Sequence, residues 1–127
     1  LLMNKYCEFI CKNVFVKVSN KKNSYFKNLD KDIFEFHIAH NEGNYFCTKD
    51  QLKEIEDNDQ IAIYYCNSDG ETEDQFNPNG SIKNIAGVFN KEKNVLGMMP
   101  HPERMIDPSL SGEDGSHFFI NLINNLK

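Results

Sequence analysis

Residues 61–66 read IAIYYC, a nearly continuous apolar run that is followed by the turn-forming residues NSDG at 67–70. A short apolar run without alternation is typical of a strand that is buried on both faces of a sheet. We therefore predict a strand over residues 61–66 and place it in a central position of the sheet. The remaining segments are expected to pack around it.

Two segments before this run have the pattern of half-buried strands. Residues 8–18 are rich in β-branched and aromatic residues and alternate at Val14, Val16 and Val18, while residues 33–38 read IFEFHI. Alternation of apolar and polar residues is the mark of a strand with one buried face. The second of these strands would deliver His40, Glu42 and Gly43 to its far end.

After residue 70 the sequence predicts a turn and then a pair of strands. Residues 76–81, FNPNGS, contain the Pro and Gly that a tight turn demands. NIAGVF at 84–89 and VLGMM at 95–99 are separated by a polar link and are predicted to pair. Gly87 and Gly97 indicate that another group passes close to the backbone of each strand.

Two helices complete the prediction. Thr48 is expected to cap a short helix that contains Leu52 and Ile55 and ends before Asn58. Asp114 or Ser116 is expected to cap a C-terminal helix. The buried stripe of that helix is predicted to consist of Phe119, Leu122, Ile123 and Leu126. Strands with flanking helices indicate a single α/β unit over residues 1–127.

Composition restricts the class of protein. The chain has 127 residues, 39% apolar and 12% aromatic residues, and a net charge of −5. This is typical of one folded domain. The negative charge argues against a nucleic-acid partner, because phosphate-binding proteins gather Lys and Arg on one face. No apolar run reaches the roughly 18 residues that a membrane span requires, so we expect no membrane partner.

The four cysteines, Cys7, Cys11, Cys47 and Cys66, form no CxxC pair and lack the spacing of a disulfide scaffold. We therefore predict reduced, structural thiols and a cytoplasmic location. Cys7 and Cys11 could join a distant His as metal ligands, but no second pair follows them. We predict no metal site.

The most informative segment is MMPHPER at 98–104, directly after a predicted strand. Two prolines bracket His101, and the carboxylate of Glu103 can lie close enough to orient its imidazole. These would be the base and the orienting group of a catalytic triad. A rigid turn that carries a surface His explains the residues equally well, because His-x-Glu is a short pattern. His37 and His117 are expected to be structural or surface residues.

Several motifs decide in favour of the catalytic interpretation: GNY at 43–45, NPNGS at 77–81, NIAGV at 84–88 and NVLGMMPHPER at 94–104. With these the chain resembles the glutaminase subunits of phosphoribosylformylglycinamidine synthase, a family of class I glutamine amidotransferases. The resemblance covers essentially the whole chain. It implies the C-terminal part of a flavodoxin-like α/β domain, with a mixed sheet and flanking helices.

The resemblance implies that His101 and Glu103 are the His and Glu of a Cys-His-Glu triad. The family's Cys lies in a Gly-x-Cys-x-Gly elbow that no cysteine of this sequence matches, so we expect it upstream of Leu1 and the chain as written to be nearly inactive alone. His40, Glu42 and Gly43 match a motif that lines the glutamine pocket. The family's motif is Ala-His-Gly-Glu-Gly, and this chain has Asn41 at the third position. Ordinary hydrogen bonding at a strand end explains His40, Glu42 and Gly43 as well.

Partners and cofactors also follow from the resemblance. The substrate would be glutamine, and the released ammonia would pass to a large synthetase subunit that makes formylglycinamidine ribonucleotide in purine biosynthesis, with a small accessory subunit in some complexes. This subunit would need no cofactor, since ATP and Mg²⁺ belong to the synthetase. Two alternatives stay open at this point. One is a non-catalytic interaction module, and the other is a cysteine hydrolase that uses Cys66 or Cys47 with His101.

Overall fold

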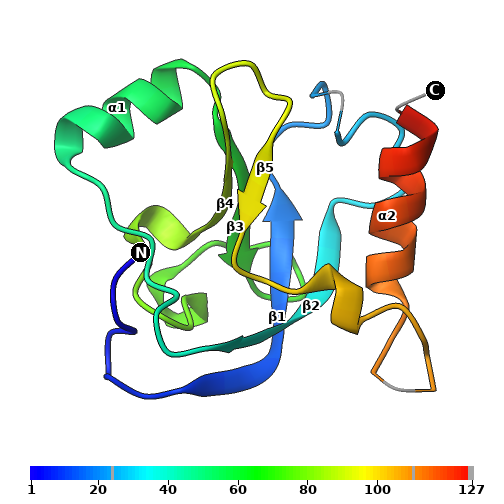
Figure 1. Cartoon of the computed structure of the whole chain (residues 1–127), viewed down its shortest axis with the longest axis horizontal. Helices are drawn as coiled ribbons and strands as arrows, with labels where there is room; N and C mark the ends of the chain where they lie inside the picture. Colours follow the sequence, from blue (N-terminus) through cyan, green and yellow to red (C-terminus); the bar gives the residue numbers. More distant parts are fainter. Residues whose placement is uncertain (24, 110, 126–127) are drawn as a thin grey trace.

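The computed structural model describes residues 1–23, 25–109 and 111–125. Five strands form one sheet in the order β2-β1-β3-β4-β5, and two α-helices accompany it (Figure 1). The elements are β1 (Ile10–Val18), β2 (Ile33–His40), α1 (Lys49–Asp57), β3 (Ile61–Cys66), β4 (Ile85–Phe89), β5 (Leu96–Met98) and α2 (Asp114–Asn125). The predicted α/β architecture with flanking helices is confirmed.

Strand β3 lies in the middle of the sheet, as its apolar sequence predicts. Every residue of β3 except Tyr64 is buried. The strand pairs with β1 on one side, from Phe15 opposite Cys66 to Val18 opposite Ile63, and with β4 on the other. Two covered faces explain why its apolar residues do not alternate with polar ones.

All neighbouring strands within the described ranges pair antiparallel, so the parallel neighbours expected of a mixed sheet do not occur there. Strands β2 and β3 both pair with β1 and therefore run in the same direction on its two sides. Helix α1 lies between them in the sequence. A parallel pair needs such a crossover connection, and here the crossover spans the intervening strand β1 instead of joining neighbours.

The core forms between the sheet and α2, which stands beside β1 and β2 in Figure 1. Phe118 of α2 is 2% exposed. Its ring lies 5.5 Å from the Phe36 ring, 6.0 Å from the Phe34 ring and 6.2 Å from the Phe26 ring, measured between centroids. The contacts with Phe34 and Phe36 are edge-on, and the contact with Phe26 is tilted. Aromatic contacts at these separations are favourable, and they anchor the helix on the sheet.

The prediction of which residues form the buried stripe of α2 is wrong. Phe119 is 36% exposed and Ile123 is 56% exposed, whereas Gly115 and Phe118 are the buried residues of the helix. Leu122 packs against the core, and Leu126 lies outside the described residues. The helix carries apolar residues on more than one side, and its contacts with the three Phe rings of the core, not its periodicity, decide which side faces inward.

The beginning of α2 also differs from the prediction. Asp114 is the first residue of the helix, and one of its oxygens accepts a hydrogen bond from the backbone N–H of Glu35 at 2.7 Å. Its other oxygen pairs with Lys31. The Ser116 hydroxyl donates to the Ile106 carbonyl at 2.8 Å. Both side chains therefore tie the helix to neighbouring segments.

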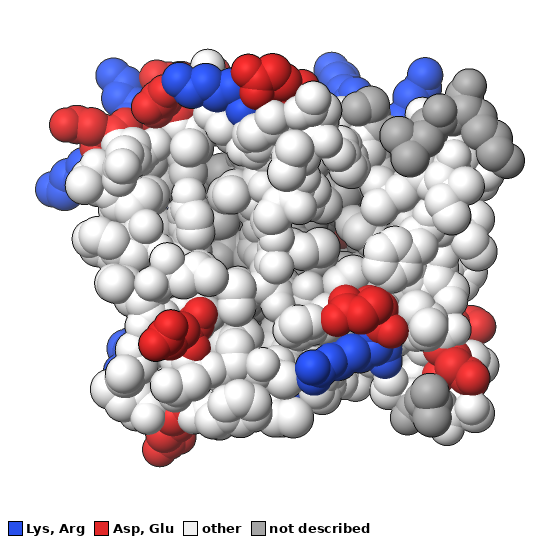
Figure 2. Space-filling model, in the orientation of Figure 1, with Lys and Arg blue, Asp and Glu red and all other residues white. Residues whose placement is uncertain are grey.

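Helix α1 is capped as predicted. Thr48 Oγ1 accepts from the Gln51 N–H at 3.3 Å, and Gln51 Oε1 accepts from the Thr48 N–H at 2.9 Å, which completes a capping box. No residue of α1 is buried. Figure 2 shows acidic and basic side chains mixed along the edge of the molecule over α1, while the centre of this face carries none. No helix in the described ranges has the length and apolarity needed to cross a membrane.

Candidate active site

The segment that contains His101 joins the two edge strands of the sheet. After β5, the Met99 N–H donates to the Ala86 carbonyl of β4 at 3.0 Å, and the His101 N–H donates to the His37 carbonyl of β2 at 2.7 Å. The three residue-to-residue steps from Met98 to His101 can span only about 10 Å. The sheet therefore curls until its edges approach each other, and His101 lies where they meet.

The backbone after His101 is held tightly against α2. Pro102 begins a single 3₁₀ turn, Pro102–Arg104, and its ring restricts the backbone there. A Cβ atom on Gly115 would lie 1.8 Å from the Pro102 carbonyl oxygen, and the Gly115 N–H donates to the Met105 carbonyl at 2.7 Å. Only glycine permits this approach of the helix to the turn.

The predicted contact between His101 and Glu103 is present. His101 Nδ1 lies 2.7 Å from Glu103 Oε1, and the two side chains are 34% and 57% exposed. Partial burial opposes ionisation of Glu103. Hydrogen bonds from its own backbone N–H and from His101, with the nearby charges of His101 and Arg104, outweigh burial and hold the pKa of Glu103 below its ordinary value. The carboxylate is therefore ionised at neutral pH.

An ionised carboxylate beside Nδ1 fixes the tautomer of His101. Glu103 can only accept, so in the neutral imidazole Nδ1 carries the proton and Nε2 has the lone pair. Among the described residues, Nε2 of His101 has no hydrogen-bond partner. An imidazole in this state can take a proton from a nucleophile and return it to a leaving group, while the carboxylate stabilises the imidazolium.

His40 lies in the interior and not in an open pocket. It is 8% exposed, and its Nε2 lies 3.1 Å from Asn79 Nδ2. Burial, and then the charge of His101, lower the pKa of His40. Because the Asn79 amide donates to Nε2, the proton is on Nδ1, which is buried without a partner among the described residues. His40 is thus a neutral neighbour of His101.

Gly43 belongs to the same interior network, whereas Glu42 does not. A Cβ atom on Gly43 would lie 2.0 Å from His40 Nε2, and the Gly43 carbonyl accepts from Asn79 Nδ2 at 2.8 Å. Glu42 is exposed. The structure brings His40 and Gly43 together in a hydrogen-bonded scaffold, and glutamine binding by these residues stays a prediction.

Asn79 is the residue that sequence reasoning missed. It is 0% exposed, and its amide also lies 3.2 Å from the Tyr65 hydroxyl. The sequence identifies residues 76–81 as a turn, and Asn79 does lie in an irregular segment there. Its partners His40 and Gly43 are 39 and 36 residues away in the sequence. The residues around Asn79 therefore could not indicate these contacts.

None of the four cysteines is paired in a disulfide. Cys47 and Cys66 are buried, and burial raises the pKa of both thiols, that of Cys66 to about 11 against the opposing charge of Lys17. A thiol in that state is a poor nucleophile at neutral pH. Cys7 and Cys11 are exposed, contrary to the expectation of structural thiols.

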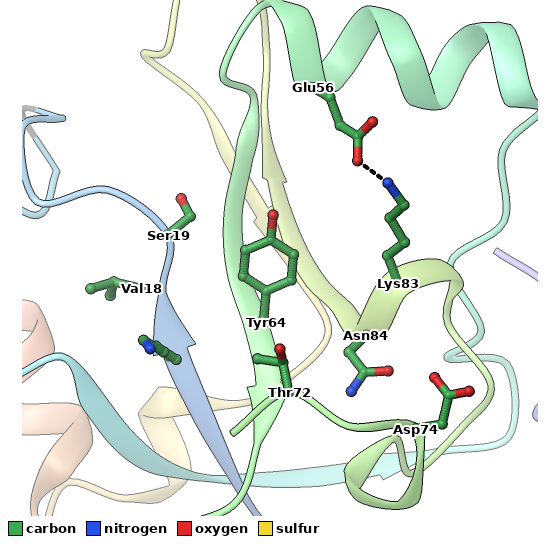
Figure 3. A pocket seen from close by; sticks show the side chains of 9 residues that line it. Val18, Ser19, Glu56, Tyr64, Thr72, Asp74, Lys83 and Asn84 are labelled. Carbon is green, nitrogen blue, oxygen red and sulfur yellow. Dashed lines mark hydrogen bonds and ion pairs between the residues drawn. The ribbon is translucent and has the colours of Figure 1, made fainter. Parts of the chain in front are cut away.

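A cavity of about 630 Å³ lies away from His101, between β1, β3 and the end of α1 (Figure 3). Its lining includes Lys17, Tyr64, Asp74 and the ion pair of Lys83 with Glu56, but neither His101 nor Glu103. Its Lys83 and Glu56 charges neutralise each other, which leaves less charge free for a ligand. No group of three or more His, Cys, Asp or Glu side chains in the described ranges is arranged to hold a metal ion.

The chain is similar to a family model and to several known proteins. The model of the CobB/CobQ-like glutamine amidotransferase domain matches residues 1–113. The chain is 75% identical over 127 residues to the phosphoribosylformylglycinamidine synthase subunit PurQ of Pelagibacter ubique, covering 100% of this chain and 56% of the relative. It is 42% identical over 126 residues to the PurQ subunit of Aquifex aeolicus, covering 98% of this chain and 56% of that protein.

A solved structure has the same fold. The structure of PurLQS from Thermotoga maritima contains a chain that superposes with a TM-score of 0.78 at 33% identity, covering 100% of this chain and 52% of that one. The chain thus spans about half the length of the curated relatives it matches.

Proposed function

Because the chain belongs to the CobB/CobQ-like glutamine amidotransferase domain family, we propose that it supplies the general base of a glutaminase. The observation that carries this proposal is the 2.7 Å contact between His101 Nδ1 and Glu103 Oε1. It orients an imidazole whose Nε2 is free to exchange protons with a substrate. The description of the matching family as a glutamine amidotransferase domain supports glutamine as that substrate.

The reaction follows from these two side chains and a cysteine thiolate. His101 takes the proton of the cysteine thiol, the thiolate attacks the side-chain carboxamide of glutamine, and the tetrahedral intermediate collapses to a thioester as His101 donates that proton to the leaving ammonia. Water then attacks the thioester while His101 takes its proton, and His101 returns this proton to the departing thiolate as glutamate is released. Glu103 stays ionised and stabilises the imidazolium in both steps.

The attacking thiol comes from outside residues 1–127 in this proposal. Its support is the state of the four cysteines: Cys47 and Cys66 are buried with raised pKa values, and no hydrogen bond in the described ranges joins any cysteine to His101. Without that thiol the chain alone would hydrolyse glutamine hardly at all, since a triad without its nucleophile loses several orders of magnitude in rate.

The proposed partners follow from the relatives. The PurQ proteins are named as subunits of phosphoribosylformylglycinamidine synthase, and the similar solved chain belongs to the structure of PurLQS. We propose that the ammonia passes to a synthetase subunit, that a small accessory subunit joins the complex, and that ATP and Mg²⁺ act on the synthetase and not on this chain. The complex would work in the cytoplasm, where the four unpaired thiols stay reduced.

The test is glutamine-dependent release of glutamate by the protein as its gene encodes it, with and without the synthetase. We expect His101→Ala to lower kcat by at least about a thousandfold, as loss of a triad base does. His117→Ala is the matched control, because His117 is a half-exposed histidine of α2 whose nearest acid, Glu113, is 4.0 Å away.

The two variants also separate the alternatives. Retained activity in His101→Ala would overturn the proposed base. A wild-type protein that binds the synthetase but releases no glutamate in its presence would instead favour the non-catalytic module.

A further inference from the structure

A second group of reactive side chains lies on the exposed surface of strands β1 and β2. Cys11 and Asn13 are two residues apart on β1, so they project from the same face. Asn13 is directly opposite His37 on β2, and Cys11 is opposite Ala39. Cross-strand neighbours at this spacing are within reach of each other, which brings a thiol, an imidazole and an amide together.

The three side chains form a continuous hydrogen-bonded series. Cys11 Sγ lies 3.4 Å from His37 Nε2, and His37 Nδ1 lies 2.9 Å from Asn13 Oδ1. The Asn13 amide nitrogen donates to Glu35 Oε1 at 3.1 Å. Cys11 is exposed, so the thiol at the end of this series is open to solvent.

The series fixes where the protons are. Glu35 accepts from Asn13 Nδ2, so the atom that Asn13 turns toward His37 is its oxygen. That oxygen accepts the proton of His37 Nδ1. His37 Nε2 therefore presents its lone pair to the Cys11 thiol. A nucleophile, a base and an orienting group in this order are the arrangement of Cys-His-Asn hydrolases.

We propose that Cys11 is a nucleophilic thiol that exchanges with low-molecular-weight disulfides, with His37 as its base and Asn13 as the residue that positions His37. The side chains of His101 and Glu103 take no part in this site. Within the described ranges, the hydrogen bond from the His101 N–H to the His37 carbonyl links it to the proposed glutaminase site. The two proposals can therefore fail separately.

The exchange balances without an added oxidant or reductant. The Cys11 proton moves to His37 Nε2, and the thiolate attacks one sulfur of the small disulfide. A new S–S bond forms at Cys11 as the original S–S bond breaks. The released thiolate takes the proton from His37, so one thiol and one disulfide give a mixed disulfide and a new thiol.

The test compares two cysteines within one molecule. The folded protein is treated with the uncharged disulfide of 2-mercaptoethanol, and mass spectrometry of peptides measures the initial rate of adduct formation at Cys11 and at Cys7. Cys7 is the internal control, because it is also exposed and its sulfur has no hydrogen bond in the described part of the chain. Cys47 and Cys66 are buried and should not react.

We expect Cys11 to react at least about tenfold faster than Cys7. This tenfold difference in rate is smaller than the rate increase of a hundredfold or more that a positioned base gives in a closed site. His37→Gln keeps a polar side chain without basicity and should bring the two rates together. Asn13→Ala should lower the ratio, whereas Asn13→Asp keeps an acceptor oxygen and should preserve it.

Equal rates at Cys7 and Cys11 in the wild-type protein would overturn the proposal. So would an unchanged ratio in His37→Gln. Circular dichroism of each variant shows whether it is folded. If His37→Gln does not fold, the Asn13→Ala ratio decides, and an unchanged ratio there also overturns the proposal.

Discussion

Asn79 shows how one side chain can hold distant parts of the chain together. Its amide lies within hydrogen-bond distance of His40 Nε2, the Gly43 carbonyl and the Tyr65 hydroxyl, and Asn79 has no exposed surface. A buried polar group without a partner costs about 1–3 kcal/mol. The amide nitrogen has two hydrogens, and the Gly43 carbonyl also accepts from Ser81 Oγ at 3.2 Å. Removing the amide would therefore leave at most His40 Nε2 and the Tyr65 hydroxyl without a partner.

We therefore expect Asn79→Ala to lower the free energy of unfolding by about 2–4 kcal/mol, measured by urea denaturation. Asn41→Ala is the control, because Asn41 is exposed and exposed substitutions usually change stability by less than about 0.5 kcal/mol. Equal effects of the two substitutions would show that the buried network adds nothing to stability.

At the scale of elements, the contact between α2 and the turn after His101 depends on Gly115. Alanine at an ordinary helical position is more stable than glycine by about 1 kcal/mol. At position 115 the added Cβ would lie 1.8 Å from the Pro102 carbonyl oxygen, which is backbone and cannot rotate away. For Gly115→Ala, helix propensity thus predicts a higher free energy of unfolding, whereas packing predicts a lower one.

We expect packing to dominate, so that Gly115→Ala lowers the free energy of unfolding by about 1–3 kcal/mol, the usual cost of overpacking. Gly97→Ala on β5 is the matched control, because its Cβ would meet only the Val88 carbonyl oxygen at 3.9 Å and should cost nothing. Thermal unfolding of both variants measures the difference. A stabilised Gly115→Ala protein would contradict the close contact.

The sequence could predict those elements whose structure is determined by residues near one another in the chain. Residues 61–66 form β3 because an apolar run needs two covered faces, and Thr48 caps α1 because its hydroxyl reaches Gln51 three residues on. Gly87 makes the predicted close contact, because a Cβ atom there would lie 2.9 Å from Ile63 Cγ1, whereas one on Gly97 would meet nothing nearer than 3.9 Å. The orientation of α2 could not be predicted, because it depends on aromatic rings contributed by distant segments.

At the scale of the whole molecule, the curl of the sheet creates the site. It brings β2 and the segment after β5 together at His37 and His101. The contact between His101 and Glu103 could be predicted from sequence because both residues lie in the segment MMPHPER at 98–104. The arrangements of His40 with Asn79 and of Cys11 with His37 could not, since each joins residues that only folding brings into contact.

In the proposed function, His101 and Glu103 act as one unit in glutamine hydrolysis. The most direct test is kcat for glutamate release by the gene-encoded protein with its synthetase, measured for wild type, His101→Ala, Glu103→Gln and the double variant. A carboxylate that acts only through the imidazole contributes nothing once the imidazole is gone. We predict that the double variant is no slower than His101→Ala alone. A double variant in which the two single losses multiply would show that the two residues act independently, and would contradict the account.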